Sequence, residues 1–278
     1  MEQAKSNLPD FASPPVIEVA VSLTFSALRA LRVAQLGLLW SEYRDRYPVV
    51  EEHPPLPPSL ERFGTVANKN VGLQIEFTAL HPVPRVWFMN QAGTELVQVQ
   101  QDRFVYNWRK AGDEDEYPRF ESVVARFQRE VEVLRSFLAK EQIGDLDPLQ
   151  CELTYVNRIP VEGTGQTPRD AFEVLRIVQP LRDAKFLPAP EDLRIGVRYL
   201  MRDESNEPVG RLLIESDPAY GISDNESMNL LKLTALLRPD GPWPEGILRS
   251  LERGRTWIVR GFADITTASM HTEWGRRQ

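Results

Sequence analysis

Several residue types that carry chemistry are scarce in this 278-residue chain. It has a single cysteine, Cys151, which excludes an internal disulfide and any metal site built from several cysteines. Cys151 falls in an expected strand, and because free cysteine is among the most buried residue types we expect it in the core. The three histidines are His53, His81 and His271, in two loops and the C-terminal tail, and we predict no metal site.

Long apolar runs are also absent. No stretch approaches the roughly 20 apolar residues that span a bilayer, and the N-terminus lacks the basic and apolar segments of a signal peptide. We therefore predict a cytoplasmic protein that does not bind membranes. The formal net charge of −7 argues against non-specific nucleic-acid binding, because that binding depends on Lys and Arg side chains that neutralise phosphates.

Familiar catalytic motifs are missing as well. The chain has no Gly-x-x-x-x-Gly-Lys phosphate loop, no His-Glu-x-x-His and no Gly-x-Ser-x-Gly. Residues 163–165 (Gly-Thr-Gly) lack the third glycine of a dinucleotide loop. We predict no cofactor and favour a protein that is not an enzyme. Four acidic residues around a later loop lack the spacing of a calcium loop, and we interpret them as solvated: Glu215, Asp217, Asp224 and Glu226.

The sequence does contain a pattern of elements that runs twice. Residues 16–25 alternate as a strand does, a helix follows over 28–46, and three further strands lead to a helix over 118–142. The same order recurs from a strand at 150–159 to the C-terminus. The other expected strands are 71–77, 85–89, 95–101, 104–109, 193–202, 209–217 and 228–238, and the other expected helices are 168–178 and one that begins near Pro244.

This order of elements predicts an α+β fold rather than a doubly wound one. We expect a tandem pseudo-repeat of strand-helix-three strands-helix, with antiparallel sheets and helices packed on one face, as in helix-grip or saddle-like folds. Residues 1–15 are an extended or disordered lead-in, 16–145 the first repeat and 146–278 the second, and the two repeats form one compact unit.

The helix over 118–142 has a narrow apolar seam. Its apolar residues recur at spacings of four and three, which places them on one side of the helix: Phe120, Val124, Phe127, Val131, Leu134 and Leu138. We expect this seam to pack on the sheet, so Phe127→Ala should cost roughly 3–5 kcal/mol by creating a cavity. Arg129→Ala should cost less than about 0.5 kcal/mol as a surface change.

Aromatic and polar residues gather on strands that are expected to be neighbours. They could stack a planar ligand or bind a peptide, and the candidate ligand-binding residues are Trp87, Tyr106, Trp108, Arg109, Tyr155 and Asn157. Alternation divides the set, since Tyr106 and Trp108 share one face of their strand and Arg109 lies on the other. The simpler interpretation is that the aromatic residues form core beneath the long helix.

The segment EEHPPLPPSLERFG (51–64) is dense in proline. This composition is incompatible with a helix or the interior of a sheet and favours polyproline II, which docks on aromatic-lined grooves of partner proteins. The candidate partner-binding residues are Pro54, Pro55, Leu56, Pro57 and Pro58. A stiff surface connector is the simpler interpretation.

Short motifs at both ends carry a resemblance to a known family. They are Pro14-Pro15-Val16-Ile17-Glu18-Val19, Trp40 with the prolines that follow it, and Phe262…Ile265-Thr266…Trp274-Gly275. The chain resembles a sporadically distributed bacterial family of uncharacterised proteins with a PP-[VI]-x-E-V motif and a PPLPP-type loop. The resemblance implies no activity and no functional residues. Its patchy distribution is typical of defence, toxin–antitoxin and mobile-element proteins.

Three functional hypotheses follow. The first is a non-catalytic binding or interaction protein of a bacterial accessory system, whose acidic surface suits a cationic partner protein. The second is a small-molecule-binding or cyclase/lyase-like helix-grip protein, which requires a cavity of roughly 300 Å³ or more near Tyr106, Trp108 and Tyr155. The third is a nucleic-acid binder that uses an arginine stripe on the last helix: Arg249, Arg253, Arg255 and Arg260. We favour the first.

Overall fold

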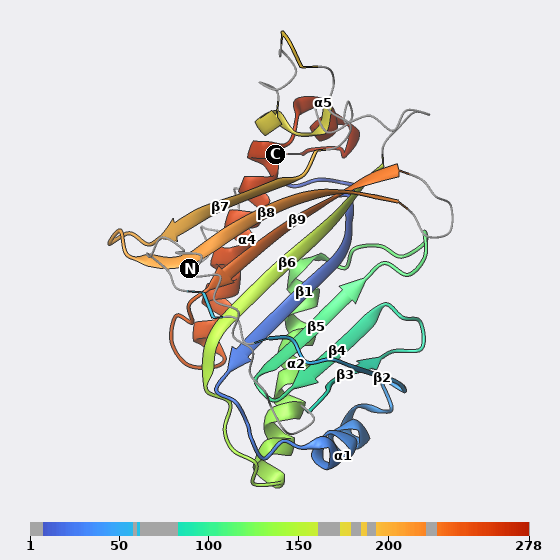
Figure 1. Cartoon of the computed structure of the whole chain (residues 1–278), viewed down its shortest axis with the longest axis vertical. Helices are drawn as coiled ribbons and strands as arrows, with labels where there is room; N and C mark the ends of the chain where they lie inside the picture. Colours follow the sequence, from blue (N-terminus) through green and yellow to red (C-terminus); the bar gives the residue numbers. More distant parts are fainter. Residues whose placement is uncertain are drawn as a thin grey trace.

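The computed structural model describes residues 8–57, 60–61, 83–160, 173–178, 185–187, 193–220 and 227–277. Within these residues the chain forms a nine-stranded antiparallel sheet with two long helices against one face (Figure 1). The fold is therefore α+β, as the sequence predicts.

The strands lie in the order β2-β3-β4-β5-β1-β6-β9-β8-β7. The central pair, β1 and β6, joins strands from the first half of the chain to strands from the second. Their bounds are β1 (Val16–Phe25), β2 (Val49–His53), β3 (Arg85–Met89), β4 (Glu95–Gln100), β5 (Arg103–Arg109), β6 (Pro148–Pro160), β7 (Ile195–Arg202), β8 (Pro208–Tyr220) and β9 (Ser227–Leu237).

The two long helices cover the same face of the sheet (Figure 1). They are α2 (Arg119–Lys140), which packs on β5 and β1, and α4 (Glu245–Ile265), which packs on β9, β6 and β8. The shorter helices are α1 (Val33–Tyr43) and α5 (Ala268–Glu273). Trp243, just before α4, contacts Phe127 of α2 with ring centroids 6.0 Å apart.

Strand alternation separates an apolar face from a polar one. Val19, Val21 and Leu23 of β1 are fully buried beneath the helices, and Tyr106 and Leu153 flank Val21 on the neighbouring strands. The helix α4 lies close to this face, since a Cβ on Gly254 would approach Leu237 Cδ1 to 2.7 Å. The apolar core therefore lies between the sheet and the two long helices.

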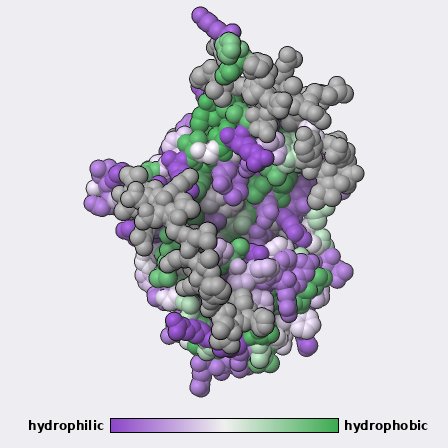
Figure 2. Space-filling model, viewed as in Figure 1, coloured by the Kyte–Doolittle hydropathy of each residue, from purple (hydrophilic) through white to green (hydrophobic). Residues whose placement is uncertain are grey.

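The opposite face, which we call the open face, is polar. Hydrophilic side chains gather in its hollow in Figure 2. Gln98 donates to Asn107 (2.8 Å), which in turn donates to the Glu18 carboxylate (2.5 Å). The polar side chains of this face are largely buried: Ser22, Thr24, Gln98, Gln100, Asn107, Gln150, Thr154 and Thr234.

A desolvated carboxyl group on the open face makes stability depend on pH. Burial raises the pKa of Glu152, which accepts a hydrogen bond from Thr154 Oγ1 (3.2 Å). A raised pKa in the folded state means that Glu152 stabilises the fold at pH values below its unfolded pKa of about 4.3. That contribution is lost as the pH rises through the higher pKa of the folded state.

We expect Glu152→Gln to be more stable than the parent protein at pH 7, because the variant buries no charge. The difference should vanish near pH 4. Thermal melting from pH 4 to pH 8 measures it, with Glu215→Gln as the control, because Glu215 pairs with Lys232 at the surface (2.8 Å). Identical pH profiles for the parent protein and Glu152→Gln would contradict the prediction.

The helix α2 buries a charge as well as its apolar seam. All six predicted seam residues are buried, and Phe127 is fully buried. Glu130 is 0% exposed too, and its carboxylate is held by Arg46 (2.8 Å), Arg129 (2.7 Å) and the Tyr47 hydroxyl (3.2 Å). Arg129 is half-exposed but is not an isolated surface side chain, so its replacement should cost more than the sequence predicts.

Two elements of the first half differ from the expected ones. The helix α1 begins at Val33 and not near 28. Before it, the Leu28 backbone N–H donates to the Gln101 carbonyl (2.8 Å) and the Leu31 N–H donates to the Leu28 carbonyl (2.9 Å), which forms a turn anchored to the sheet in place of the first helical turn. The strand β2 was not expected in a proline-rich region. It is an edge strand that ends at His53, before the first proline of the segment, where no ladder hydrogen bond is lost.

Other expectations fall partly outside the described residues. The expected strand 71–77 lies outside them, as does the beginning of the expected helix 168–178, whose described part (173–178) forms short helical turns. The C-terminal tail, in which the sequence places His271 without a secondary-structure element, contains α5. There His271 lies against Phe11 (ring centroids 5.6 Å apart), and burial, assisted by the charge of Arg276, lowers the pKa of His271.

Candidate functional site

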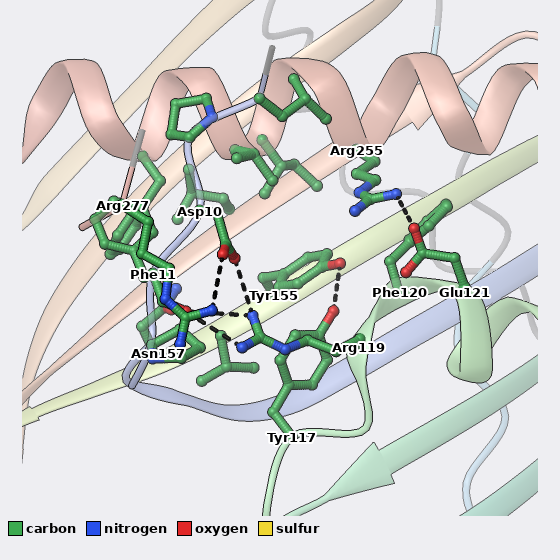
Figure 3. A pocket seen from close by; sticks show the side chains of 18 residues that line it. Asp10, Phe11, Tyr117, Arg119, Phe120, Glu121, Tyr155, Asn157, Arg255 and Arg277 are labelled. Atoms are coloured by element: carbon green, nitrogen blue, oxygen red, sulfur yellow. Dashed lines mark hydrogen bonds and ion pairs between the residues drawn. The ribbon is translucent and has the colours of Figure 1, made fainter. Parts of the chain in front are cut away.

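A cavity of about 450 Å³ lies on the helix side of the sheet. It is bounded by α4, the beginning of α2, strands β1, β6 and β9, and the N-terminal segment 8–14 (Figure 3). The apolar part of its lining includes Phe11, Val16, Phe120, Leu233, Ile258 and Phe262. Its size falls within the range of about 300–1,000 Å³ that is usual for small-molecule sites.

The segment 8–14 closes one side of the cavity because it is bound to the C-terminus. Phe11 is buried, and its ring packs edge-on against Phe262 of α4 with centroids 5.5 Å apart. The Arg277 backbone N–H donates to the Asp10 carbonyl (2.8 Å), and the Ala12 N–H donates to the carbonyl of Gly275 (3.1 Å). The two ends of the described chain therefore build one wall together.

Two tyrosines provide the hydroxyl groups of the lining. Tyr117, before α2, and Tyr155, on β6, approach to 2.8 Å between their hydroxyl oxygens (Figure 3). Burial raises the pKa of Tyr155 to about 12 and that of Tyr117 further, so both keep their protons at neutral pH. One hydroxyl donates to the other, and no described residue accepts the proton of the second. The pair can therefore donate one hydrogen bond to a ligand.

Arg119 connects α2 to the N-terminal segment. Its guanidinium donates twice to the Phe11 carbonyl (3.3 Å each) and lies 3.3 Å from the Asp10 carboxylate. The backbone φ of Arg119 is +68°, in the left-handed region that residues other than glycine rarely adopt. Strained residues of this kind are often found at binding and active sites.

Arg255 of α4 lies at another side of the cavity. Its guanidinium stands 4.7 Å from the Phe120 ring centroid and pairs with Glu121 at 2.6 Å, which links α4 to the first turn of α2. A third arginine, Arg277, lies 3.5 Å from Asp10. Arg119 and Arg277 thus share one carboxylate at distances longer than the 2.7–2.9 Å usual for charge-assisted hydrogen bonds.

The lining is positively charged overall. It contains three arginines, Arg119, Arg255 and Arg277, against two carboxylates, Asp10 and Glu121. The surplus of one positive charge sits beside apolar walls, with Arg255 the least exposed of the three arginines at 24%. The cavity therefore suits a molecule with an apolar body and an anionic group.

Two of the predicted ligand-binding residues line this cavity. They are Tyr155 and Asn157, which stand on the same face of β6. Asn157 is 3% exposed and donates its Nδ2 to the Leu231 carbonyl (3.0 Å), while its Oδ1 accepts no hydrogen bond from a described residue. Trp108 does not line the cavity but supports it, since its ring packs against Tyr117 at 5.7 Å.

The other predicted ligand-binding residues lie elsewhere. Tyr106 is fully buried in the core, where burial followed by the charge of Glu95 raises its pKa. Trp87 lies on the open face, stacked on His53 with ring centroids 4.0 Å apart. Arg109 belongs to the same face, where it donates to the Gly93 carbonyl (2.8 Å) of the β3–β4 hairpin. The six residues therefore do not form one site.

The proline-rich segment contacts the open face. Gln100 of β4 holds the backbone of Leu56, while Pro54 and Pro57 are exposed. Pro58 lies outside the described residues. None of the four described residues, Pro54, Pro55, Leu56 and Pro57, borders the cavity.

The other candidates from the sequence show ordinary pairings where they are described. In the arginine stripe, Arg249 and Arg253 both pair with Asp240 (3.4 and 3.5 Å). Cys151 is buried, which raises the pKa of its thiol to about 12 and keeps it protonated. Among the described residues, no group of three or more His, Cys, Asp or Glu side chains could hold a metal ion. No helix described is long and apolar enough to cross a membrane.

Sequence reasoning missed most of the charged lining. Tyr117 and Arg119 flank Pro118, where the expected helix begins, so the sequence indicated only a helix boundary at these positions and no binding role. Asp10 and Arg277 lie 267 positions apart and meet only in the folded chain. The one usable signal was Arg255, which stood out as part of the arginine stripe. Comparisons with protein-family models and with curated proteins found no match for this chain.

Proposed function

We propose that this protein is a non-catalytic binding protein whose ligand is a small amphipathic organic anion held in the cavity. The observation that carries the proposal is the pairing of apolar walls with three arginines and a tyrosine pair that has one proton to donate. The ligand's apolar body would pack against Ile258 and Phe262. Its anionic group would reach Arg119 and Arg277 in place of Asp10, whose contacts with them are long.

The chemistry of the lining favours binding over catalysis. The tyrosine hydroxyls remain protonated at neutral pH and so cannot act as general bases. Both carboxylates of the lining are engaged in ion pairs with arginines, Asp10 with Arg119 and Glu121 with Arg255. Among the residues that the structure describes, no cysteine, serine, histidine or lysine lines the cavity as a nucleophile.

The architecture proposed from the sequence fits this site. We infer that the chain is a tandem pseudo-repeat of the helix-grip kind. In each half the first strand pairs with the last (β1 with β5, β6 with β9), and the helix after the last strand packs against that strand. The strand β2 has no counterpart among the described residues of the second half. Superposition of residues 16–142 on 150–267 tests the repeat, and fewer than half of the elements matching in order and direction would refute it.

A role in a bacterial accessory system, such as defence or a toxin–antitoxin pair, stays a prediction from the resemblance of the sequence. A binding protein for a small anion is compatible with such a role, because a ligand-dependent change in the paired termini could alter a partner-binding surface.

A fluorescent probe tests the anion site. Anilinonaphthalenesulfonate has an aromatic body and one sulfonate, and phenylnaphthylamine is the same molecule without the sulfonate. We expect the sulfonate to bind one per chain, at least about tenfold more tightly than the neutral molecule, a difference of about 1.4 kcal/mol. Fluorescence titration at fixed ionic strength measures both.

Two variants assign the binding to the cavity. Val259→Trp, which places a large side chain in the lining, should abolish probe binding, and Arg277→Met should weaken the sulfonate about tenfold while leaving the neutral molecule unchanged. Arg249→Met is the matched control, because Arg249 is also an exposed arginine paired with one aspartate and lies outside the cavity. Equal sulfonate binding by all three variants would show a surface site elsewhere and refute the proposal.

A further inference from the structure

The open face holds part of the chain itself in an extended form. Residues 54–57 and 60–61, which we call the strap, contact side chains of three strands. Gln100 of β4 both accepts from the Leu56 N–H (3.0 Å) and donates to the Leu56 carbonyl (3.1 Å). Gln150 of β6 accepts from the Glu61 N–H (2.9 Å), and Arg211 of β8 pairs with the Glu61 carboxylate (2.7 Å).

Most of these contacts are hydrogen bonds to the backbone of the strap, and only the pair between Arg211 and Glu61 involves a side chain of the strap. A glutamine amide that pairs with both the N–H and the C=O of one residue copies the pairing between strands. From β4 to β6 the sheet order passes through β5 and β1, so the strap runs across the strands. The distance of three strand spacings is about 14 Å. An extended chain covers it in the five residue-to-residue steps from Leu56 to Glu61, at about 3.3 Å each.

The strap leaves donors beside it without acceptors. Arg103 lies opposite Gln100 on β5, and Arg85 of β3 donates its Nη1 to Gln98 (3.0 Å). The Nε atoms of both arginines are nevertheless buried with no hydrogen-bond partner, as is the indole N–H of Trp87. No carboxylate of the described residues lies within 4.0 Å of either guanidinium. Burial, followed by the charge of Arg103, lowers the pKa of Arg85, which is consistent with two guanidinium groups that lie close enough to repel each other.

Unpaired buried donors are costly, and native proteins rarely leave several together without a functional reason. An occupant with a carboxylate at this position would satisfy them. The described part of the strap offers one carboxylate, that of Glu61, and Arg211 already binds it. The side chains of Arg211 and Glu61 are 13% and 20% exposed.

We propose that the open face is a binding surface for an extended, acidic segment of a partner protein, and that the strap occupies this surface in the isolated chain. The partner's backbone pairs with Gln100 and Gln150, and its carboxylates pair with Arg211 and with the Arg85–Arg103 pair. The face also contains Glu18 and Glu152, so a segment with a few carboxylates opposite the arginines suits it better than a polyanion such as single-stranded nucleic acid, which carries a charge at every phosphate. This inference does not depend on the cavity ligand.

The test uses the full chain with the strap replaced. In the strapless variant, residues 54–61 become a Gly–Ser linker of equal length, and the probe is a labelled peptide with the sequence of residues 51–62 (EEHPPLPPSLER). We expect the strapless variant to bind the peptide with a Kd below about 100 µM. The parent chain should bind it at least tenfold more weakly, because its tethered strap competes at an effective concentration in the millimolar range.

Further substitutions locate the binding. In the strapless chain, Gln100→Ala should weaken the peptide at least tenfold, and the peptide with Glu61→Gln should bind about tenfold more weakly than the original. Of three peptides that carry Asp at position 55, 57 or 58, at least one should bind more tightly, and Arg103→Gln should remove that gain. Arg135→Gln is the control, because Arg135 is exposed on α2, on the other side of the sheet.

Three results would each overturn the proposal. The first is that the strapless chain folds but binds no peptide, and the second is that neither Gln100→Ala nor Arg103→Gln changes peptide binding. The third is that the strapless chain binds an oligothymidine of similar length more tightly than every peptide. If the strapless chain fails to fold by circular dichroism, Leu56→Pro in the parent chain replaces it. That variant removes the donated N–H and leaves the sheet unchanged, and the same outcomes apply.

Discussion

Replacing Phe127 by alanine is expected to lower the free energy of unfolding by roughly 3–5 kcal/mol. Phe127 is fully buried on α2, and its ring lies 6.0 Å from Phe104 of the sheet and 6.0 Å from Trp243 before α4. The side chain therefore fills the space where the sheet and both long helices meet. Truncation leaves a cavity that these elements cannot close, because each is held by other contacts.

Urea or guanidinium unfolding monitored by circular dichroism measures this loss. The matched control is Arg135→Ala on the same helix, whose side chain is 44% exposed and pairs with Glu132, so that its loss should cost less than about 0.5 kcal/mol. Arg129 is a poorer control than the sequence suggests, because it pairs with Glu130. A cost below about 1.5 kcal/mol for Phe127→Ala would mean that the packing of α2 on the sheet is loose.

The second large effect is expected at Glu130. Replacing it by alanine should cost roughly 3–5 kcal/mol, because the buried carboxylate is the common partner of two arginines and a tyrosine. It is 0% exposed, and it connects α2 to the end of α1 through Arg46 and Tyr47. Burial, reinforced by the charge of Glu130, raises the pKa of Tyr47, so this hydroxyl stays a hydrogen-bond donor to the carboxylate.

A double-mutant cycle separates the ion pair from the cavity that alanine leaves. Glu130→Gln keeps the volume and removes the charge, and Arg46→Met keeps the stem of the arginine. We expect the two changes to couple by about 1–3 kcal/mol, as contacting residues of one network do. Additive effects of the two changes would show that Arg46 contributes through its apolar stem alone.

The local pattern of the sequence determined the elements and the faces of the strands. Alternation in 16–25 and the repeat of four and three in 118–142 each predicted the buried side correctly, since period two and period 3.6 place side chains on one face. The same periodicity would have found Glu130, which stands three residues after Phe127 and four before Leu134. The predicted seam was defined by apolar residues only, so the prediction missed the charged residue Glu130 on the buried face of the helix.

Proline and turn residues predicted element boundaries that depend on neighbouring residues. They did not predict elements that depend on pairing with a distant part of the chain. The strands expected over 85–89 and 95–101 and the helix expected over 118–142 lie close to β3, β4 and α2. The proline and turn residues gave no indication of β2, because a five-residue edge strand is stabilised by its partner β3 and not by its own residues. The early beginning expected for α1 failed for a similar reason, since the Leu28 N–H binds a carbonyl 73 positions away.

The sequence by itself therefore determined the α+β class, the two long amphipathic helices and the apolar face of the sheet. The tertiary structure alone decided which polar residues meet. Asp10, Arg119, Arg255 and Tyr155 come from four distant segments that converge on one cavity, and Leu56 reaches Gln100 across the open face. Hydrophobic periodicity is a property of neighbouring residues, whereas a site depends on how separate elements pack, and spacing along the chain does not encode that arrangement.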